Sequence, residues 1–222
     1  MDLILATAMF GAIVATFDIY WVLRLFLVQL VSLFRQTKSV TDEFCTYSIC
    51  WTTDIDIFIH MNNGKYFREL DFARFDFYFL TGIFSSSWRF TILFWFGALN
   101  SLFGNINEEK RVYIVQHGAM IRFRKPLNFL MPFVVKTKMV FFDKTSLYFE
   151  QTFISKPDNF GRAIALCKNT VVNCPDVVEF MREMYNVSQP ECPPDLAKYL
   201  EANDISSKKL RQESSVNSNK ED

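Results

Sequence analysis

The residues most able to carry out chemistry lie close together, within residues 54–66. Two carboxylates, Asp54 and Asp56, precede His60, which is one of only two histidines in the chain. A carboxylate near a carbonyl carbon can act as a general base or as a nucleophile, and a histidine can transfer a proton because it titrates near neutral pH. Asp56 is the better placed carboxylate, because it stands four residues before His60. The stretch therefore indicates a site that acts on a carbonyl group.

A helix is expected to begin directly after these residues. Its apolar side chains recur every three or four positions, which predicts one long helix over residues 63–80 (Tyr66, Leu70, Ala73, Phe77 and Leu80). Asn62 and Asn63 stand at its start, where an asparagine side chain can accept a hydrogen bond from a free N–H group of the first turn. Because the helix dipole and the other N–H groups point the same way, this end could polarise a bound carbonyl.

The pattern D-x-D-x-x-x-H-x-N-N-x-x-Y over residues 54–66 resembles the signature of the hot-dog-fold thioesterases, and the resemblance extends over residues 40–200. It implies an α+β protein in which an antiparallel sheet wraps around one long central helix. It also implies action on an acyl thioester, either acyl-CoA or an acyl carrier, with no cofactor. Proteins of this fold usually pair through the sheet edge and the helix, so the resemblance further implies a homodimer.

By this resemblance Asp56 and His60 are the catalytic residues, and His60 would orient or protonate the leaving thiolate. Glu69 is a second candidate base, because some hot-dog enzymes use a carboxylate on the helix. The alternative for Glu69 is a solvated or dimer-facing charge. Five residues are expected to bind the substrate, three of them through backbone N–H groups at the helix start: Asn62, Asn63 and Gly64, with Tyr66 and Phe58.

Two positions depart from the family pattern. Phe58 stands where the plant acyl carrier protein thioesterases have asparagine, and Ile59 stands where other relatives have glycine. An apolar side chain at position 58 removes one polar contact and could occlude the site. The alternative to an enzyme is therefore a catalytically inactive acyl-binding or scaffold protein of the same fold, in which His60 caps or staples the loop.

Strands are predicted on both sides of the helix from the alternation of apolar and polar residues. One strand is expected over residues 44–51, and four antiparallel strands are expected between residues 112 and 172, with turns near residues 143–145 and 157–159. We therefore expect the hot-dog domain over residues 44–203, ending in short surface helices. Residues 204–222 are rich in Ser, Lys, Asn and Glu, which predicts a disordered tail.

The N-terminal segment is almost wholly apolar over residues 3–23, with Asp18 as its one charge. A helix of that length spans roughly 31 Å at about 1.5 Å per residue, close to the thickness of a bilayer core. Arg24, Arg35 and Lys38 follow the segment and no basic residue precedes it, which favours an uncleaved anchor with a cytosolic domain over a cleaved signal peptide.

We therefore expect a membrane anchor or signal segment over residues 1–34 and a polar linker over residues 35–43. The expected location is the endoplasmic reticulum membrane, and secretion after signal cleavage is the alternative. The aromatic-rich residues 83–103 are expected to form a helix or lid packed on the core. The alternative for that segment is a wall of an acyl-chain pocket or a second membrane contact.

The overall composition excludes some other classes of function. The formal net charge is zero, so no basic surplus points to nucleic acid. The five cysteines are irregularly spaced and odd in number, which favours reduced thiols over a disulfide framework. The two histidines stand far apart and no metal-ligand cluster accompanies them, so a metal site is not expected.

Overall fold

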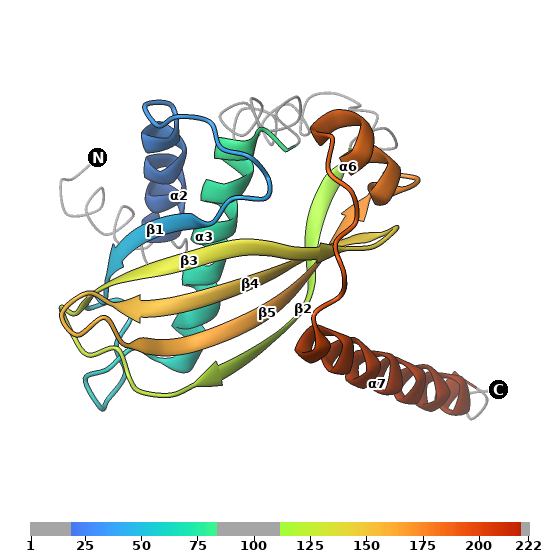
Figure 1. The fold of residues 1–222 in the computed structure, drawn as a ribbon. Helices are drawn as coiled ribbons and strands as arrows, with labels where there is room; N and C mark the ends of the chain where they lie inside the picture. Colours follow the sequence, from blue (N-terminus) through green and yellow to red (C-terminus); the bar gives the residue numbers. More distant parts are fainter. Residues whose placement is uncertain (1–18, 84–111, 219–222) are drawn as a thin grey trace, which may run out of the picture.

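The computed structural model describes residues 19–83 and 112–218, with side chains up to residue 212 (Figure 1). Its elements follow one another as helix, strand, long helix, four strands and two helices. They are α2 (Ile19–Ser32), β1 (Phe44–Ile49), α3 (Asn63–Thr81), β2 (Tyr113–Phe123), β3 (Pro132–Phe142), β4 (Ser146–Ser155), β5 (Gly161–Val172), α6 (Val177–Tyr185) and α7 (Pro194–Ser218).

The strands form one five-stranded sheet in the order β1-β3-β4-β5-β2, and every neighbouring pair is antiparallel. The turn between β3 and β4 is closed by Asp143, whose Oδ1 accepts the backbone N–H groups of Thr145 (2.8 Å) and Ser146 (2.9 Å). An aspartate in this place lets two strands reverse direction within a few residues. The predicted α+β hot-dog fold with an antiparallel sheet is thus confirmed.

One face of the sheet packs against α3, and the two together form the main core. Leu70, Ala73 and Phe77 of α3 are fully buried, and the Phe77 ring lies 4.6 Å from that of Phe44 on β1 and 5.0 Å from that of Phe149 on β4. Burying several such side chains at about 1.5–3 kcal/mol each supplies the main stabilisation of this layer. The structure places α3 at residues 63–81, where the periodicity predicts residues 63–80.

The opposite face of the sheet is covered in part by the first turns of α7. Leu196 and Tyr199 of α7 pack against Tyr148 on β4 and Leu166 on β5. Successive strand residues point to opposite faces, so Tyr148 faces α7 whereas its neighbour Phe149 faces α3.

The structure continues α7 to Ser218, whereas the composition predicts a disordered tail over residues 204–222. Two causes favour this continuation. The packed first turns supply the costly helix nucleus, after which each further residue adds a hydrogen bond at little cost. Lys208 also forms an ion pair with Asp204 one turn earlier, at 2.6 Å.

The N-terminal part of the described chain packs closely on the domain. The predicted linker at residues 35–43 is not free: Val40 is buried, and the backbone N–H of Lys38 donates to the carbonyl of Leu80 at 3.1 Å. Most of the predicted apolar segment, and the aromatic residues 84–103, lie outside the described residues. Among those described, no helix is both long enough and apolar enough to cross a membrane.

Candidate active site

The loop between β1 and α3 folds back on itself and holds the residues singled out above. Isolated bridges join Ile55 to Met61 and His60 to Asn128. The backbone N–H of Asp56 donates to the carbonyl of His60, and that of Ile59 donates to the carbonyl of Asp56, both at 3.0 Å. The loop tip is therefore a tight turn that brings residues 56 and 60 together.

Ile59 closes this turn in the left-handed region, with φ of 59°. A β-branched residue is strained there, whereas glycine adopts that conformation freely. The structure thus explains why a glycine suits the position before the histidine, and it shows that this chain forms the same turn with isoleucine.

The structure brings Asp56 and His60 within reach of one another. Asp56 Oδ1 lies 3.6 Å from His60 Nδ1 and also accepts the backbone N–H of Phe58 at 2.9 Å. The two side chains are 23% and 32% exposed respectively, so a substrate and water can reach them. None of the described residues forms a hydrogen bond to His60 Nε2. His60 Nδ1 also lies 3.4 Å from the carbonyl oxygen of Met61, so the contacts at this nitrogen orient the imidazole and leave Nε2 for a ligand.

Phe58 stacks on the imidazole of His60, with ring centroids 5.8 Å apart and an interplanar angle of 21°. Its side chain is 72% exposed, and its neighbours Ile57 and Ile59 are exposed as well. An apolar residue at this position therefore covers one face of the imidazole and leaves an apolar rim beside the pair.

The start of α3 has fewer free N–H groups than the sequence suggests. The Asn62 side chain caps the helix by accepting the N–H of Gly64 at 2.9 Å, and the N–H of Asn62 donates to the carbonyl of Asp54 at 2.8 Å. Of the three N–H groups expected to face a carbonyl, only that of Asn63 lacks a partner among the described residues. Asn63 is exposed, so this group and the helix dipole remain available to a bound oxygen atom.

Tyr66 lies in the core rather than at the surface of the site. Its hydroxyl accepts the backbone N–H of Leu127 at 3.2 Å, and its ring meets those of Phe123 and Phe153 edge to face. Burial raises the pKa of this phenol, although the hydrogen bond from Leu127 works in the opposite direction. The predicted substrate contact is therefore a structural tie between α3 and the loop at residues 124–131.

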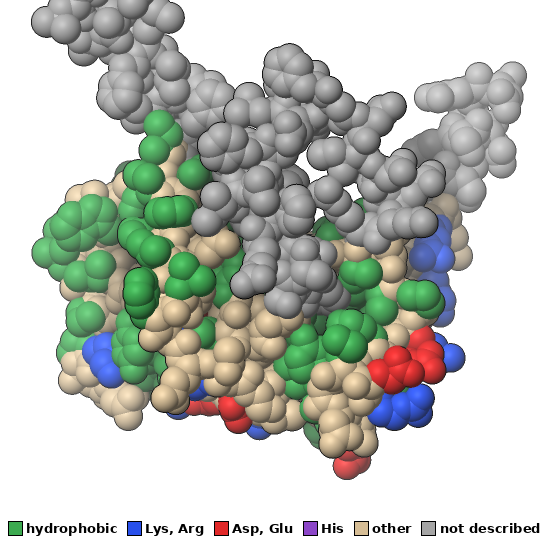
Figure 2. All heavy atoms as spheres, turned by 90° about the horizontal axis from the view of Figure 1, so that it is seen from above, with side chains coloured by type: hydrophobic (Ala, Val, Ile, Leu, Met, Phe, Trp, Pro, Cys, Tyr) green, Lys and Arg blue, Asp and Glu red, His purple; other side chains and the backbone are tan. Residues whose placement is uncertain are grey.

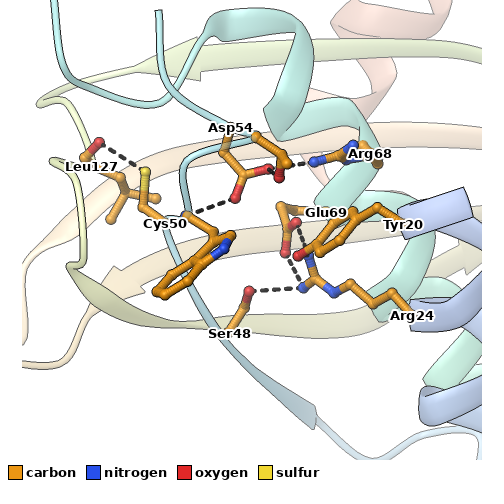
Figure 3. A network of polar contacts seen from close by, with 10 residues as sticks. Tyr20, Arg24, Ser48, Cys50, Asp54, Arg68, Glu69 and Leu127 are labelled. Atoms are coloured by element: carbon orange, nitrogen blue, oxygen red, sulfur yellow. Dashed lines mark hydrogen bonds and ion pairs between the residues drawn. The ribbon is translucent and has the colours of Figure 1, made fainter. Parts of the chain in front are cut away.

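Glu69 does not stand free as a base. It is buried, and both of its carboxylate oxygens accept hydrogen bonds from the guanidinium of Arg24 on α2 (Figure 3). Arg24 also donates to Ser48 Oγ at 2.7 Å. Burial raises the pKa of the Glu69 carboxyl, and the charge of Arg24 opposes that rise. The carboxylate on the helix thus serves to hold α2 against α3.

Asp54 has a similar structural role despite its place in the motif. It is fully buried, forms an ion pair with Arg68 of α3 and accepts the backbone N–H of Trp51 at 2.8 Å (Figure 3). These contacts fasten the start of the loop to the helix. Sequence reasoning missed the pairing of Glu69 with Arg24 and of Asp54 with Arg68, because each pair joins residues that are far apart in the chain.

A small pocket lies further along α3, between that helix and strands β2 and β5. It is lined by Asp71, Arg74, Phe75, Tyr78, Ile114, Gln116 and Asn169. The buried Arg74 donates to Gln151 Oε1 at 2.8 Å and forms an ion pair with Asp71. Asp71 lies about 12 Å along the helix from Asn63 at 1.5 Å per residue, so the pocket is separate from the Asp56–His60 pair.

Comparison with known proteins defines the class of this protein. Residues 50–200 match the thioesterase-like superfamily, and the chain belongs to that superfamily. The resemblance read from residues 54–66 is therefore confirmed at the level of the superfamily.

Individual relatives cover nearly the whole chain. The chain is 35% identical to protein THEM6 of Drosophila melanogaster over 196 residues, which make up 87% of this chain and 91% of that protein. It is 30% identical to protein THEM6 of Xenopus laevis over 222 residues, 99% of this chain and 98% of that protein. Among solved structures, a 1,4-dihydroxy-2-naphthoyl-CoA thioesterase of Synechocystis, Slr0204, aligns with a TM-score of 0.42 and 11% identity, covering 59% of this chain and 82% of that chain.

Proposed function

We propose that this protein hydrolyses acyl thioesters at the Asp56–His60 pair. The observation that carries the proposal is the 3.6 Å approach of Asp56 Oδ1 to His60 Nδ1 beside the start of α3. Membership of the thioesterase-like superfamily supplies the substrate class. Both side chains are partly exposed, as a reaction with water and a large substrate requires.

The reaction can be written from these groups. Asp56 takes a proton from water as the water oxygen bonds to the carbonyl carbon, while the N–H of Asn63 stabilises the charge on the carbonyl oxygen. The carbon–sulfur bond then breaks, and the leaving thiolate takes a proton from the imidazolium of His60. The proton on Asp56 passes to His60, which restores both groups and leaves a carboxylic acid and a thiol.

The test is a panel of acyl-CoA hydrolysis assays on the full-length protein and its Asp56→Asn variant. Asparagine keeps an oxygen for the N–H of Phe58, so the turn survives, but an amide is neither a base nor a useful nucleophile. We expect kcat/KM to fall by about 10²-fold or more. Asp176→Asn is the matched control, because Asp176 caps α6 far along the chain and asparagine caps helices equally well.

A second function, acyl binding without hydrolysis, is favoured by one observation. The ring of Phe58 covers one face of the His60 imidazole, and the backbone N–H of Phe58 already donates a hydrogen bond to Asp56 Oδ1. Wild-type protein that binds acyl-CoA tightly without cleaving it, and an Asp56→Asn variant that binds equally well, would establish this second function. Failure of both proteins to bind or cleave any acyl-CoA would refute both proposals.

A homodimer is proposed as the functional unit. Among the described strands, β2 pairs with β5 on one side only, so its other edge offers unpaired N–H and C=O groups. Side chains along β2, including Tyr113, Val115 and Met120, are exposed. Light scattering of the purified protein after size-exclusion chromatography tests this proposal, and a monomer would contradict it.

The endoplasmic reticulum membrane, with the domain in the cytosol, is the proposed location, and it rests on the basic residues that follow the apolar segment. Protease treatment of intact microsomes should digest the domain. A protected domain, or a glycan on Asn186 within the sequence Asn-Val-Ser, would show the opposite orientation. An N-terminus that begins after residue 15 in the mature protein would show cleavage and favour secretion.

A further inference from the structure

Helix α2 is turned with its charged side toward the protein and its apolar side toward the outside. Arg24 is the one charged residue of α2, and its side chain, which is only 14% exposed, packs against Glu69 and over the ring of Phe72, 4.3 Å from the ring centroid. Apolar residues that are 39–57% exposed follow one another along the outer side: Leu23, Phe26, Leu27, Leu30 and Val31. We call these five residues the outer stripe.

The spacing of the outer stripe is the one that normally faces a protein core. Its members stand at positions i, i+3, i+4, i+7 and i+8, which place them on one side of a helix. A helix surrounded by water would bury such a stripe and expose its arginine. Burying an arginine–glutamate pair costs desolvation that a hydrophobic contact avoids, so this orientation is favoured only where the outside is itself apolar.

Helix α2 is held in this orientation at both ends. Arg24 pairs with Glu69, and Arg35, just after the helix, pairs with Asp76 through contacts of 2.6 and 2.7 Å. Glu69 and Asp76 stand two turns apart on α3, so α2 lies lengthwise along α3 (Figure 1). Figure 2 shows hydrophobic side chains gathered on the side of the molecule where α2 lies.

The occupant that fits this surface is lipid. Residues 3–17 are uncharged and lead through Asp18 into α2. The one other charge between residue 3 and the end of the helix, Arg24, is turned toward Glu69. A second copy of the chain is a poorer fit. Five side chains that each expose about half of their surface fall short of the roughly 800 Å² per partner of a stable protein interface. No such minimum applies to a lipid surface, where contacts add along the chain.

We propose that α2 lies in the plane of a lipid bilayer surface, with the outer stripe in the acyl-chain boundary and α3 directly behind it. The domain would then rest on the membrane in one fixed orientation instead of hanging from a flexible linker. The proposal goes beyond the thioesterase activity and does not depend on it.

The test places an environment-sensitive fluorescent amino acid at position 27 of the full-length chain, reconstituted in phosphatidylcholine vesicles. The matched control carries it at position 209, because Lys209 is exposed on α7. Position 27 should show blue-shifted emission and should be quenched by lipids that carry a spin label on the acyl chain, whereas position 209 should show neither effect. Protection of the buried Cys50 from a thiol reagent reports that each labelled protein is folded.

Two further positions decide the orientation of the helix. Leu23 and Val31, two turns apart, should be quenched equally if α2 lies in the plane of the surface. A steep difference between them would show that α2 is the end of a spanning helix and would overturn the proposal. Quenching at position 27 no greater than at position 209 would overturn it as well, since a second copy or another segment of the chain would then cover the outer stripe.

Discussion

Replacing Arg24 by methionine should destabilise the fold strongly, because it leaves the carboxylate of Glu69 buried without its cation. Glu69 is 1% exposed, and Arg24 contacts both of its oxygens. Removing one partner of a buried ion pair costs about 3–5 kcal/mol.

The loss should depend on pH with a defined sign. Without Arg24, burial holds the pKa of Glu69 in the folded state above the value of 4.5 that it has in the unfolded chain. The folded state then binds the proton more tightly, so stability is retained below pH 4.5 and is lost as the pH rises. Relative to wild type, Arg24→Met should therefore lose stability progressively as the pH rises from 5 to 7.

Urea denaturation of the full-length protein in detergent micelles, followed by tryptophan fluorescence at pH 5, 6 and 7, measures both effects. The matched control is the double variant Arg24→Met with Glu69→Met, which removes both charges and fills the same space. We expect this variant to lie within about 1 kcal/mol of wild type, or above it. A single Arg24→Met variant that loses less than about 1 kcal/mol at pH 7, with no change between pH 5 and pH 7, would refute the buried pairing of α2 with α3.

Three further changes test the site. Ile59→Gly should raise the free energy of unfolding by about 0.5–1 kcal/mol, because relief of the left-handed backbone strain outweighs the added chain entropy and the lost side chain is mostly exposed. Thermal unfolding measures this change, and a loss of stability would contradict the strained turn. Phe58→Asn should raise kcat/KM on acyl-CoA about tenfold by uncovering His60 and adding a polar contact, and an unchanged or lower value would show that Phe58 does not limit the reaction. Tyr66→Phe should cost about 1–3 kcal/mol of stability because it leaves the N–H of Leu127 unpaired, while KM stays within about twofold of wild type; a large rise in KM without loss of stability would instead place Tyr66 at the substrate.

The features that depend on residues close together in the sequence could be predicted from the sequence. Alternation along residues 112–172 identified the strands and their antiparallel succession, because side chains on a strand point alternately to its two faces. The approach of Asp56 to His60 also arises within a five-residue turn, so the spacing of the motif carries it. The extent of α7 does not follow from composition, because composition describes residues one by one, whereas a helix extends from a nucleus packed elsewhere.

The roles of the polar side chains of the motif depend on the tertiary structure. Glu69 meets Arg24 across 45 residues, and Tyr66 accepts a hydrogen bond from Leu127 across 61 residues. A motif shows which residues are able to act on a carbonyl. A carboxylate can act as a base, however, only if it is not already paired with a cation of the same protein. Such pairing takes place between segments far apart in the chain. The orientation of α2 has the same origin. Its sequence contains both an apolar stripe and an arginine, and the arginine faces inward because it pairs with the buried Glu69 on α3.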